Sequence, residues 1–186
     1  DQSELPEVLE LPSSVGFKLF AHEARQRVIA EIYDGRELTA TEAAELCGLT
    51  PSAMSYHLRM LQKAGVVELA PASDDGRERR YRRMASYLQI NGAGGSGPEM
   101  HATVMIWIDS LSRAANRWLA AGAGGHGGIF TESLRLTEEQ NAELITRLRG
   151  LYRDYALLSD GNGPETPRWE SYWAHLPKVD GAAAQE

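Results

Sequence analysis

Hydrophobic residues along this chain recur mostly at intervals of three and four, the spacing of a helix that is buried on one face. The clearest example is the segment 98–121, where apolar side chains form one continuous stripe. The alternation typical of strands is limited to short stretches. The pattern therefore predicts a mainly α protein with a small β component.

The helical spacing covers five segments. We predict helices over 14–33, 39–48, 50–65, 98–121 and 137–158. Strands are predicted at Leu38 and over 66–70, 78–84 and 130–136. The segment 169–176 is ambiguous, because its residues have helical spacing while its aromatic content favours a strand; we favour the strand.

Local signals define the two short helices. Thr39 followed by Glu42 is a capping box that begins the first helix, and Gly48 can take the left-handed conformation that ends it. Thr50 is a second N-cap, followed by Pro51 at a position where the backbone N–H has no helical partner. The buried face of this second helix is expected to consist of Met54, Leu58 and Leu61.

A basic hairpin follows the second short helix. Gly65 ends the helix, and Val66-Val67 begins a strand. The return strand, residues 78–84, comes after the turn Asp74-Asp75-Gly76 and carries four arginines. Two short helices and a two-stranded basic wing leave the outer face of the second helix free for the major groove of DNA.

This segment resembles the winged helix-turn-helix of the ArsR/SmtB-like bacterial repressors, over residues 17–84. The similarity lies in the run Leu-Thr-Ala-Thr-Glu-Ala-Ala-Glu-Leu at 38–46, the Ser-Tyr-His-Leu of the second helix and its Ala-Gly-Val-Val exit. The resemblance implies double-stranded DNA as a partner and a homodimeric bacterial regulator of the type that does not sense metals. It does not identify the signal that is sensed.

The outward side of the second helix supplies the candidate DNA contacts. Small hydroxyl groups allow close approach, Ala53 can meet a thymine methyl group, and Arg59 can reach guanine or phosphate. The predicted contacts are Thr50, Ser52, Ala53, Ser55, Tyr56 and Arg59 on the helix, with Arg77 and Arg79 on the wing. The alternatives are an ordinary solvated helix face and edge-strand charge that prevents aggregation. His57 is expected to pack inside the domain.

Charge is unevenly distributed. The chain of 186 residues has a net charge of −7, yet residues 51–90 carry 7 basic and 4 acidic side chains. Residues 1–50 carry 4 basic and 10 acidic side chains, and residues 91–186 carry 8 and 12. A local basic patch matters more for phosphate binding than total charge does. The acidic remainder favours a sequence-selective binder over a protein that coats DNA.

Metal and enzyme chemistry have little support in the sequence. The resemblance places the thiolates of metal sensors at Thr39 and Thr41, which are poor ligands for soft metals. Cys47 is expected to be a small core residue, and the histidines lack the spacing of a tetrahedral site. The sequence has no phosphate loop, nucleophile elbow or HExxH motif. We therefore expect no metal, no cofactor and no enzymatic activity.

Composition suggests how the chain is organised. The predicted parts are a flexible acidic tail (1–13), the DNA-binding domain (14–90), a glycine-rich hinge (91–97) and a dimerisation and effector region (98–186). One cysteine fits a reducing compartment, and no apolar run approaches the roughly 20 residues of a membrane span. The acidic start does not resemble a secretory signal. These features predict a cytoplasmic protein associated with the nucleoid, without membrane contact.

The long helix over 98–121 carries the candidate dimer interface. Its stripe is too wide for one layer of a small domain to cover, and it consists of Val104, Trp107, Ile108, Leu111, Ala115 and Trp118. Four tryptophans are candidates for lining a pocket for an organic effector: Trp107, Trp118, Trp169 and Trp173. The alternative, which we favour, is that they form dimer and domain core.

The sequence is therefore interpreted as that of a sequence-specific transcriptional regulator. We expect a repressor that binds an imperfect palindrome as a homodimer, with release by an organic effector as a further expectation. The alternative is a protein-interaction module whose winged-helix domain does not bind DNA. An enzyme with a helix-turn-helix appendage is disfavoured, because no catalytic constellation is visible.

Overall fold

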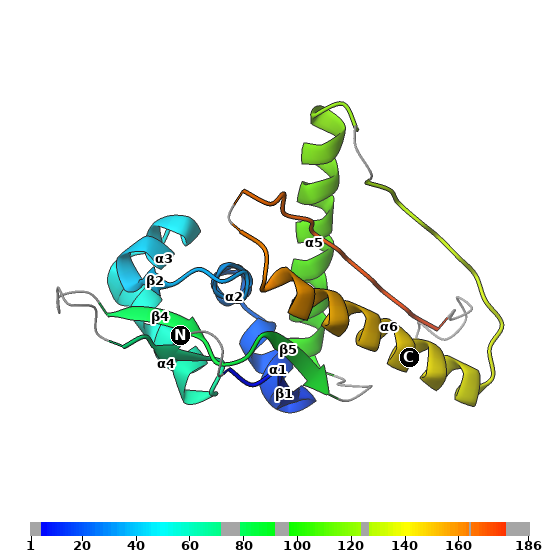
Figure 1. Ribbon diagram of the computed structural model, residues 1–186, viewed down its shortest axis with the longest axis horizontal. Helices are drawn as coiled ribbons and strands as arrows, with labels where there is room; N and C mark the ends of the chain where they lie inside the picture. Colours follow the sequence, from blue (N-terminus) through cyan, green and yellow to red (C-terminus); the bar gives the residue numbers. More distant parts are fainter. Residues whose placement is uncertain (1–4, 72–78, 92–96, 124–126, 164, 178–186) are drawn as a thin grey trace.

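The computed structural model describes residues 5–71, 79–91, 97–123, 127–163 and 165–177 (Figure 1). The helices are α1 (Ser13–Phe20), α2 (Glu23–Tyr33), α3 (Ala40–Cys47), α4 (Pro51–Lys63), α5 (Pro98–Ala120) and α6 (Glu138–Ser159). The strands are β1 (Val8–Pro12), β2 (Leu38–Thr39), β3 (Val67–Leu69), β4 (Arg80–Arg83) and β5 (Tyr87–Asn91). The predicted fold class, mainly helical with a small β wing, is confirmed.

One core holds α2, α3 and α4 together with the wing. The predicted buried face of α4 is confirmed, since Met54, Leu58 and Leu61 are completely buried. Strands β3 and β4 form the antiparallel wing, and β2 pairs with the other edge of β4, so that the sheet order is β2-β4-β3. Burying one face of α4 in this way necessarily turns its other face outward.

The capping signals are confirmed at both ends of the helix-turn-helix. The Glu42 N–H donates to Thr39 Oγ1 at 3.1 Å, and the Thr39 N–H donates to the Glu42 carboxylate at 2.7 Å. Gly48 ends α3 at φ 64°, and Gly65 follows α4 at φ 71°. These local signals fix the turn between α3 and α4, and with it the angle between the two helices.

The N-terminal region differs from the prediction in two respects. The expected single helix over 14–33 is broken into α1 and α2, because His22 acts as an N-cap whose Nδ1 accepts the Ala24 N–H at 3.2 Å. The expected tail over 1–13 is wrong for residues 8–12, which form β1 and pair in parallel with β5. The strand β5 was not predicted, since its partner lies far away in the sequence and leaves no local signal.

The C-terminal region contains α5 and α6 close to their predicted bounds. The strands expected over 130–136 and 169–176 are wrong, because these segments are extended but pair with no other strand among the described residues. Alternating side chains do not make a strand without a partner for the backbone groups. Of the predicted hinge over 91–97, residues 92–96 lie outside the described part, and Asn91 belongs to β5.

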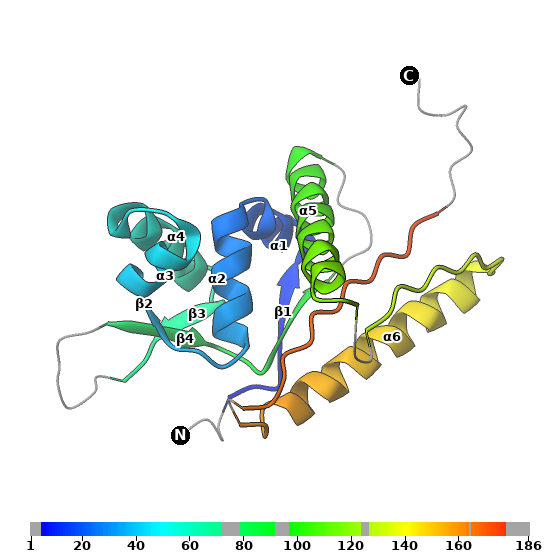
Figure 2. The same ribbon diagram turned by 90° about the horizontal axis from the view of Figure 1, so that it is seen from above.

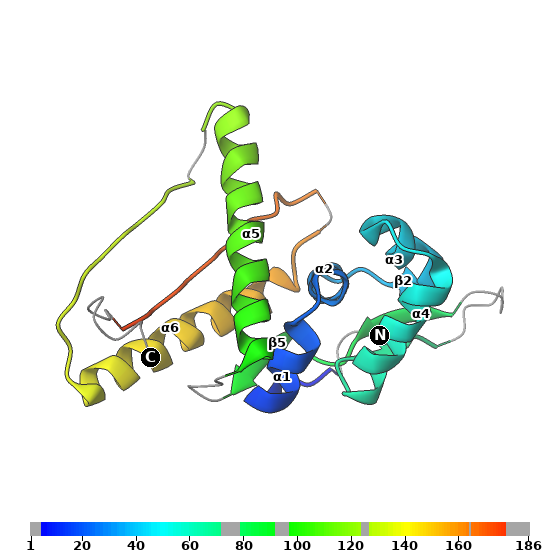
Figure 3. The same cartoon turned by 180° about the vertical axis from the view of Figure 1, so that it is seen from behind.

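The elements are arranged along the long axis of the molecule. The wing and α4 lie at one end, α5 stands in the middle, and α6 lies at the other end (Figures 1 and 2). Viewed from behind, α4 lies away from both α5 and α6 (Figure 3). No helix among the described residues is long and apolar enough to cross a membrane.

Packing of α1 on the β1–β5 pair depends on Gly16. A Cβ atom at this position would lie 2.7–2.9 Å from three side-chain atoms of Ile90. We expect Gly16→Ala to destabilise the protein by about 1–3 kcal/mol through overpacking. In an Ile90→Ala background the same change should instead stabilise it by up to about 1 kcal/mol, the helix propensity of alanine over glycine. Urea unfolding of the four proteins measures both values, and an unchanged sign would contradict this packing.

Candidate nucleic-acid interface

The outward face of α4 carries the predicted DNA contacts. Tyr56 is 56% exposed, and Ser52 and Arg59 are exposed beside it. Ala53 and Ser55 are half-buried at the edge of this face. The opposite face is the buried one, as predicted. The helix therefore presents one aromatic ring, one guanidinium and several small side chains to solvent, which matches the chemistry used to read base edges in a major groove.

Two of the predicted contacts have intrahelical roles as well. Thr50 Oγ1 accepts the Ala53 N–H at 3.3 Å, which makes it the N-cap of α4. The Ser55 hydroxyl donates to the Pro51 carbonyl at 2.8 Å. Thr50 still has its hydroxyl proton to donate, and Ser55 still has oxygen lone pairs to accept with. Thr50 is thus suited to a phosphate oxygen, and Ser55 to a donor group on a base.

The wing is less basic than its sequence suggests. Arg80 pairs with Glu42 at 3.1 Å and donates to the Glu37 carbonyl at 3.0 Å. Arg82 pairs with Glu68 at 2.8 Å. Arg79 is exposed, whereas the predicted contact Arg77 lies outside the described residues. Among the described arginines of the wing, Arg79 is therefore the one best placed for a phosphate or a minor groove.

Arg83 connects the wing to the end of α6. It is buried, pairs with Asp160 at 2.6 Å, and donates to the Tyr33 carbonyl at 3.2 Å. Asp160 directly follows α6, so this ion pair ties the wing to the end of that helix. The sequence did not reveal this role, because the partner acid lies 77 residues further along the chain.

A buried cluster behind α4 was not predicted from the sequence. Arg25 is only 7% exposed, and its Nη1 lies 3.5 Å from His57 Nδ1. The His57 ring packs on His22 with ring centroids 4.3 Å apart and touches the Tyr56 ring edge-on at 5.6 Å. A signal was present, since Arg25 shares the buried helical spacing of Val28, Ile29 and Ile32. The expectation that His57 packs inside the domain is confirmed.

Both histidines of this cluster resist protonation. Burial, aided by the nearby Arg25 guanidinium, lowers the pKa of His22, although Glu23 opposes the shift. Burial, His22 and Arg25 together lower the pKa of His57. Neutral imidazoles are thus the form that the folded protein favours, and a proton added here would sit beside a fixed positive charge.

Cys47 packs against the core, as expected. Its thiol lies 3.7 Å from the Ala24 carbonyl, and burial raises its pKa. Within the described residues, no group of three or more His, Cys, Asp or Glu side chains could hold a metal ion. The geometry therefore gives Cys47 a packing role.

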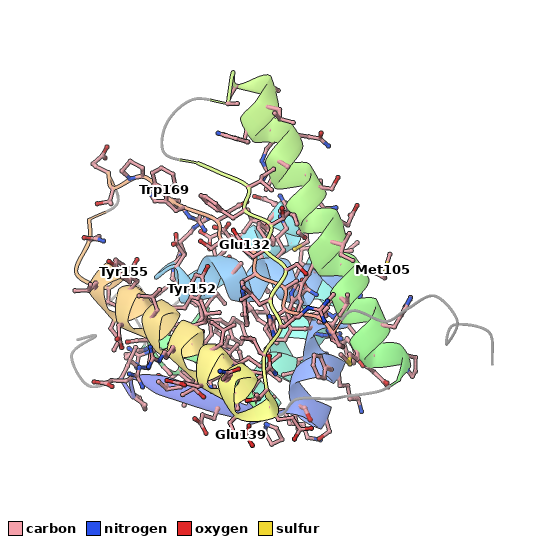
Figure 4. All side chains as sticks on the ribbon, turned by 90° about the vertical axis from the view of Figure 1, so that its right-hand side faces the viewer. Met105, Glu132, Glu139, Tyr152, Tyr155 and Trp169 are labelled. Carbon is pink, nitrogen blue, oxygen red and sulfur yellow. The ribbon has the colours of Figure 1, made fainter. Side chains whose placement is uncertain are left out.

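Three of the four tryptophans of the candidate effector pocket are 40–66% exposed, and Trp118 is half-buried. Trp107 packs edge-on against Phe20 of α1, with ring centroids 6.4 Å apart. Trp173 stacks on His175, and Trp169 is 66% exposed on the extended segment after α6 (Figure 4). The described part of the chain thus does not gather them into one enclosed site, and an effector pocket stays a hypothesis.

The predicted stripe on α5 is largely uncovered. Three of its members, Trp107, Ile108 and Leu111, are 40–53% exposed. Met105 and Leu119 add to this apolar surface, and Met105 points away from the rest of the chain (Figure 4). Large contiguous apolar surfaces on soluble proteins usually mark an interface.

Comparison with protein families gives one match, over the segment that contains α2, α3 and α4. Residues 20–70 match the family described as "Helix-turn-helix domain". No match was found among curated proteins.

Solved structures give only distant similarity. Reduced HlyU from Vibrio cholerae has a TM-score of 0.34 and 23% identity, covering 54% of this chain and 85% of its own. The heme sensor protein PefR from Streptococcus agalactiae, in complex with heme, has a TM-score of 0.33 and 13% identity, covering 80% and 84%. A MarR family protein of Mycobacterium tuberculosis, in complex with p-aminosalicylic acid, has a TM-score of 0.28 and 21% identity, covering 75% and 93%. At these TM-scores the similarities carry no functional inference.

The buried histidines predict how stability depends on pH. Because folding lowers the pKa of His22 and His57, the unfolded chain takes up protons first as the pH falls. Their contribution is therefore complete above the ordinary histidine value of about 6.5 and is lost as the pH falls from there towards their folded pKa values. Urea unfolding at a series of pH values between about 7.5 and 5 should show this loss.

The matched variant is His57→Gln, which removes one of the two titrating rings. We expect its free energy of unfolding to fall less steeply with pH than that of the wild type over the same range. The carboxylates with lowered pKa, such as Glu42, titrate at lower pH and do not obscure the comparison. An identical pH slope in the variant would contradict the assignment to His57.

Proposed function

We propose that this chain is a repressor which binds an imperfect DNA palindrome as a homodimer. The proposal starts from the match of residues 20–70 to the helix-turn-helix family. The observation that carries the proposal is the outward face of α4, which stands free at the end of the molecule away from α5 and α6 (Figure 3). Tyr56, Arg59 and Ser52 on this face suit base and phosphate contact. The proposed mode of binding is insertion of α4 into the major groove.

The second copy of this chain is the proposed partner of α5. A helix of 23 residues is about 34 Å long, and its exposed stripe includes Met105, Trp107, Ile108 and Leu111. In a two-fold dimer the same patch covers itself, so that one apolar stripe is enough for both subunits. The two α4 helices would then meet successive major grooves, about 34 Å apart.

Regulation by an organic effector is a further part of the proposal. Trp107 lies on the proposed dimer helix and Trp169 on the segment after α6, so a ligand that orders these aromatic side chains would act on the spacing of the subunits. A ligand that favours one spacing shifts the population and changes the affinity for DNA. Repression rather than activation rests on the resemblance of residues 17–84 to bacterial repressors.

A protein-interaction module is the second candidate function. The observation in its favour is the neutralisation of Arg80 by Glu42 and of Arg82 by Glu68, which removes positive charge from the wing. The two functions differ in their response to salt, because displacement of counterions from phosphates makes DNA binding weaken steeply as salt rises.

Selection of bound duplexes from a random pool tests the proposed function. We expect wild-type protein to enrich a palindromic sequence, and the affinity for that duplex to fall steeply with salt. Tyr56→Ala should cost about 1–3 kcal/mol on the selected duplex and much less on a random duplex of equal length. Tyr155→Ala, which removes an exposed tyrosine of α6, is the control. Enrichment of no sequence would overturn the proposal, and equal losses on both duplexes would remove Tyr56 from base reading.

The dimer is tested by charging the centre of the stripe. Leu111→Glu should separate the subunits, because a buried carboxylate without a partner is costly. The winged domain should stay folded, since Leu111 is 43% exposed within one subunit. Sedimentation and circular dichroism measure the two properties, with Leu158→Glu on α6 as the control. A monomeric wild type at micromolar concentration, or a dimeric variant, would place the interface elsewhere.

A further inference from the structure

Three helices meet at the last turn of α1. The carbonyl groups at the end of a helix have no partner within it, and here side chains of other helices bind them. Arg25 of α2 donates from Nε to the Leu19 carbonyl at 2.6 Å and from Nη2 to the Lys18 carbonyl at 2.8 Å. Gln26 donates to the Phe20 carbonyl at 2.5 Å. The end of α1 is therefore fixed by side-chain donors.

Arg25 also reaches the buried face of α4, the helix proposed to read DNA. Its Nη1 lies 3.5 Å from His57 Nδ1 and 4.0 Å from Met60 Sδ, both on α4. Burying a guanidinium is costly unless its charge is compensated. The negative end of the α1 dipole and the two carbonyl groups supply that compensation. One rigid fork of donors thus joins the end of α1 to α4.

Helix α5 rests on the same turn from another side. Thr103 is fully buried, and its hydroxyl lies 3.1 Å from the Phe17 carbonyl and 2.9 Å from the Glu99 carbonyl of its own helix, which share its single proton. One turn further along α5, the Trp107 ring packs edge-on against Phe20. Three consecutive carbonyl groups of α1 therefore accept hydrogen bonds from other helices: residue 17 from Thr103 of α5, and residues 18 and 19 from Arg25.

We infer that Arg25 is a positioning residue through which α5 sets the placement of the reading helix α4. The inference rests on the proposed function, in which α4 reads DNA and α5 joins the subunits. A movement of α5 against the winged domain displaces the end of α1, and Arg25 passes that displacement to His57 and so to α4. Arg25 touches no DNA in this arrangement, because it is buried behind the outward face.

The planar fork is what the role requires. A lysine at position 25 would keep the positive charge, but its compact ammonium cannot satisfy Lys18, Leu19 and His57 together in one fixed plane. Arg25→Lys therefore separates geometry from charge, whereas Arg25→Met removes both. The charged and titratable groups around the cluster are His22, Glu23 and Arg25 on α2 with its N-cap, and Tyr56 and His57 on α4.

The experiment measures DNA affinity and the His57 titration on the full chain. The probes are the duplex that wild-type protein selects from a random pool and a random duplex of the same length. We expect both Arg25 variants to bind the selected duplex about tenfold more weakly, the equivalent of one lost base contact, and the random duplex with little change. Arg147→Met, an exposed arginine of α6, is the matched control and should bind like the wild type.

A second readout distinguishes positioning from simple loss of stability. In a histidine NMR titration, Arg25→Met should raise the pKa of His57 in part, because burial and His22 continue to lower it. Arg25→Lys should leave this pKa as low as in the wild type and still lose affinity for the selected duplex. Thr103→Val tests the link to α5. The double variant Thr103→Val/Arg25→Lys should lose affinity by less than the product of the fold losses of the two single variants, because both residues act on the last turn of α1.

The outcomes separate the two proposals. If wild-type protein selects no duplex, the proposed function fails. If it selects one and folded Arg25→Lys binds it with unchanged affinity, the inference is overturned while the proposed function stands. If the losses of DNA affinity caused by Thr103→Val and Arg25→Lys are fully independent, α5 does not act on α4 through Arg25, and the inference is likewise overturned. Should Arg25→Met not fold, Arg25→Lys and Thr103→Val still decide.

Discussion

One-sided burial of α4 is the constraint on which the rest of the structure depends. Met54, Leu58 and Leu61 enter the core completely, and this fixes the rotation of the helix about its axis. The rotation in turn decides that Tyr56 and Arg59 face outward. Burying three such side chains stabilises the domain by roughly 1.5–3 kcal/mol each, far more than a surface contact contributes. The outward direction of the proposed DNA-reading face is therefore a consequence of how the core is packed.

The elements that the sequence predicted correctly are those with short-range signals. The capping box at Thr39, the left-handed Gly48 and the N-cap at Thr50 each act within a few residues, and each lies where it was expected. The parallel pairing of β1 with β5 joins residues near opposite ends of the winged domain, so nothing local indicated it. The predictions for the segments after α5 and after α6 failed in the opposite way. Their alternating or aromatic character suggested strands, but no strand among the described residues pairs with them.

The candidate site shows the same division. The outward face of α4 follows from periodicity alone, so its residues could be listed in advance. The arginines of the wing that remain available for DNA could not be listed in advance. Glu42 and Glu68, which lie on other elements, neutralise Arg80 and Arg82. Arg25 is an intermediate case. Its place in the apolar spacing of α2 indicates that it is buried. The carbonyl groups that accept its hydrogen bonds are available only because the helix predicted over 14–33 is interrupted at His22. The periodicity of the sequence thus locates the candidate site, while acidic residues distant in the sequence determine how much positive charge the wing keeps.

The pair Arg83–Asp160 illustrates what such a tertiary partner costs and contributes. A buried ion pair gains little net stability, because desolvation of both charges offsets their attraction. Its geometry is nevertheless specific: Arg83 is anchored to the Tyr33 carbonyl and to the residue after α6, and its Nε has no hydrogen-bond partner among the described residues. Together with Arg168, which pairs with Asp34 at 2.9 Å, it holds the region around the end of α6 against the winged domain. Arg83 and Arg168 thus join the winged domain to the region after α6. Helix α5 is joined to it separately, by the contacts of Thr103 and Trp107 with α1.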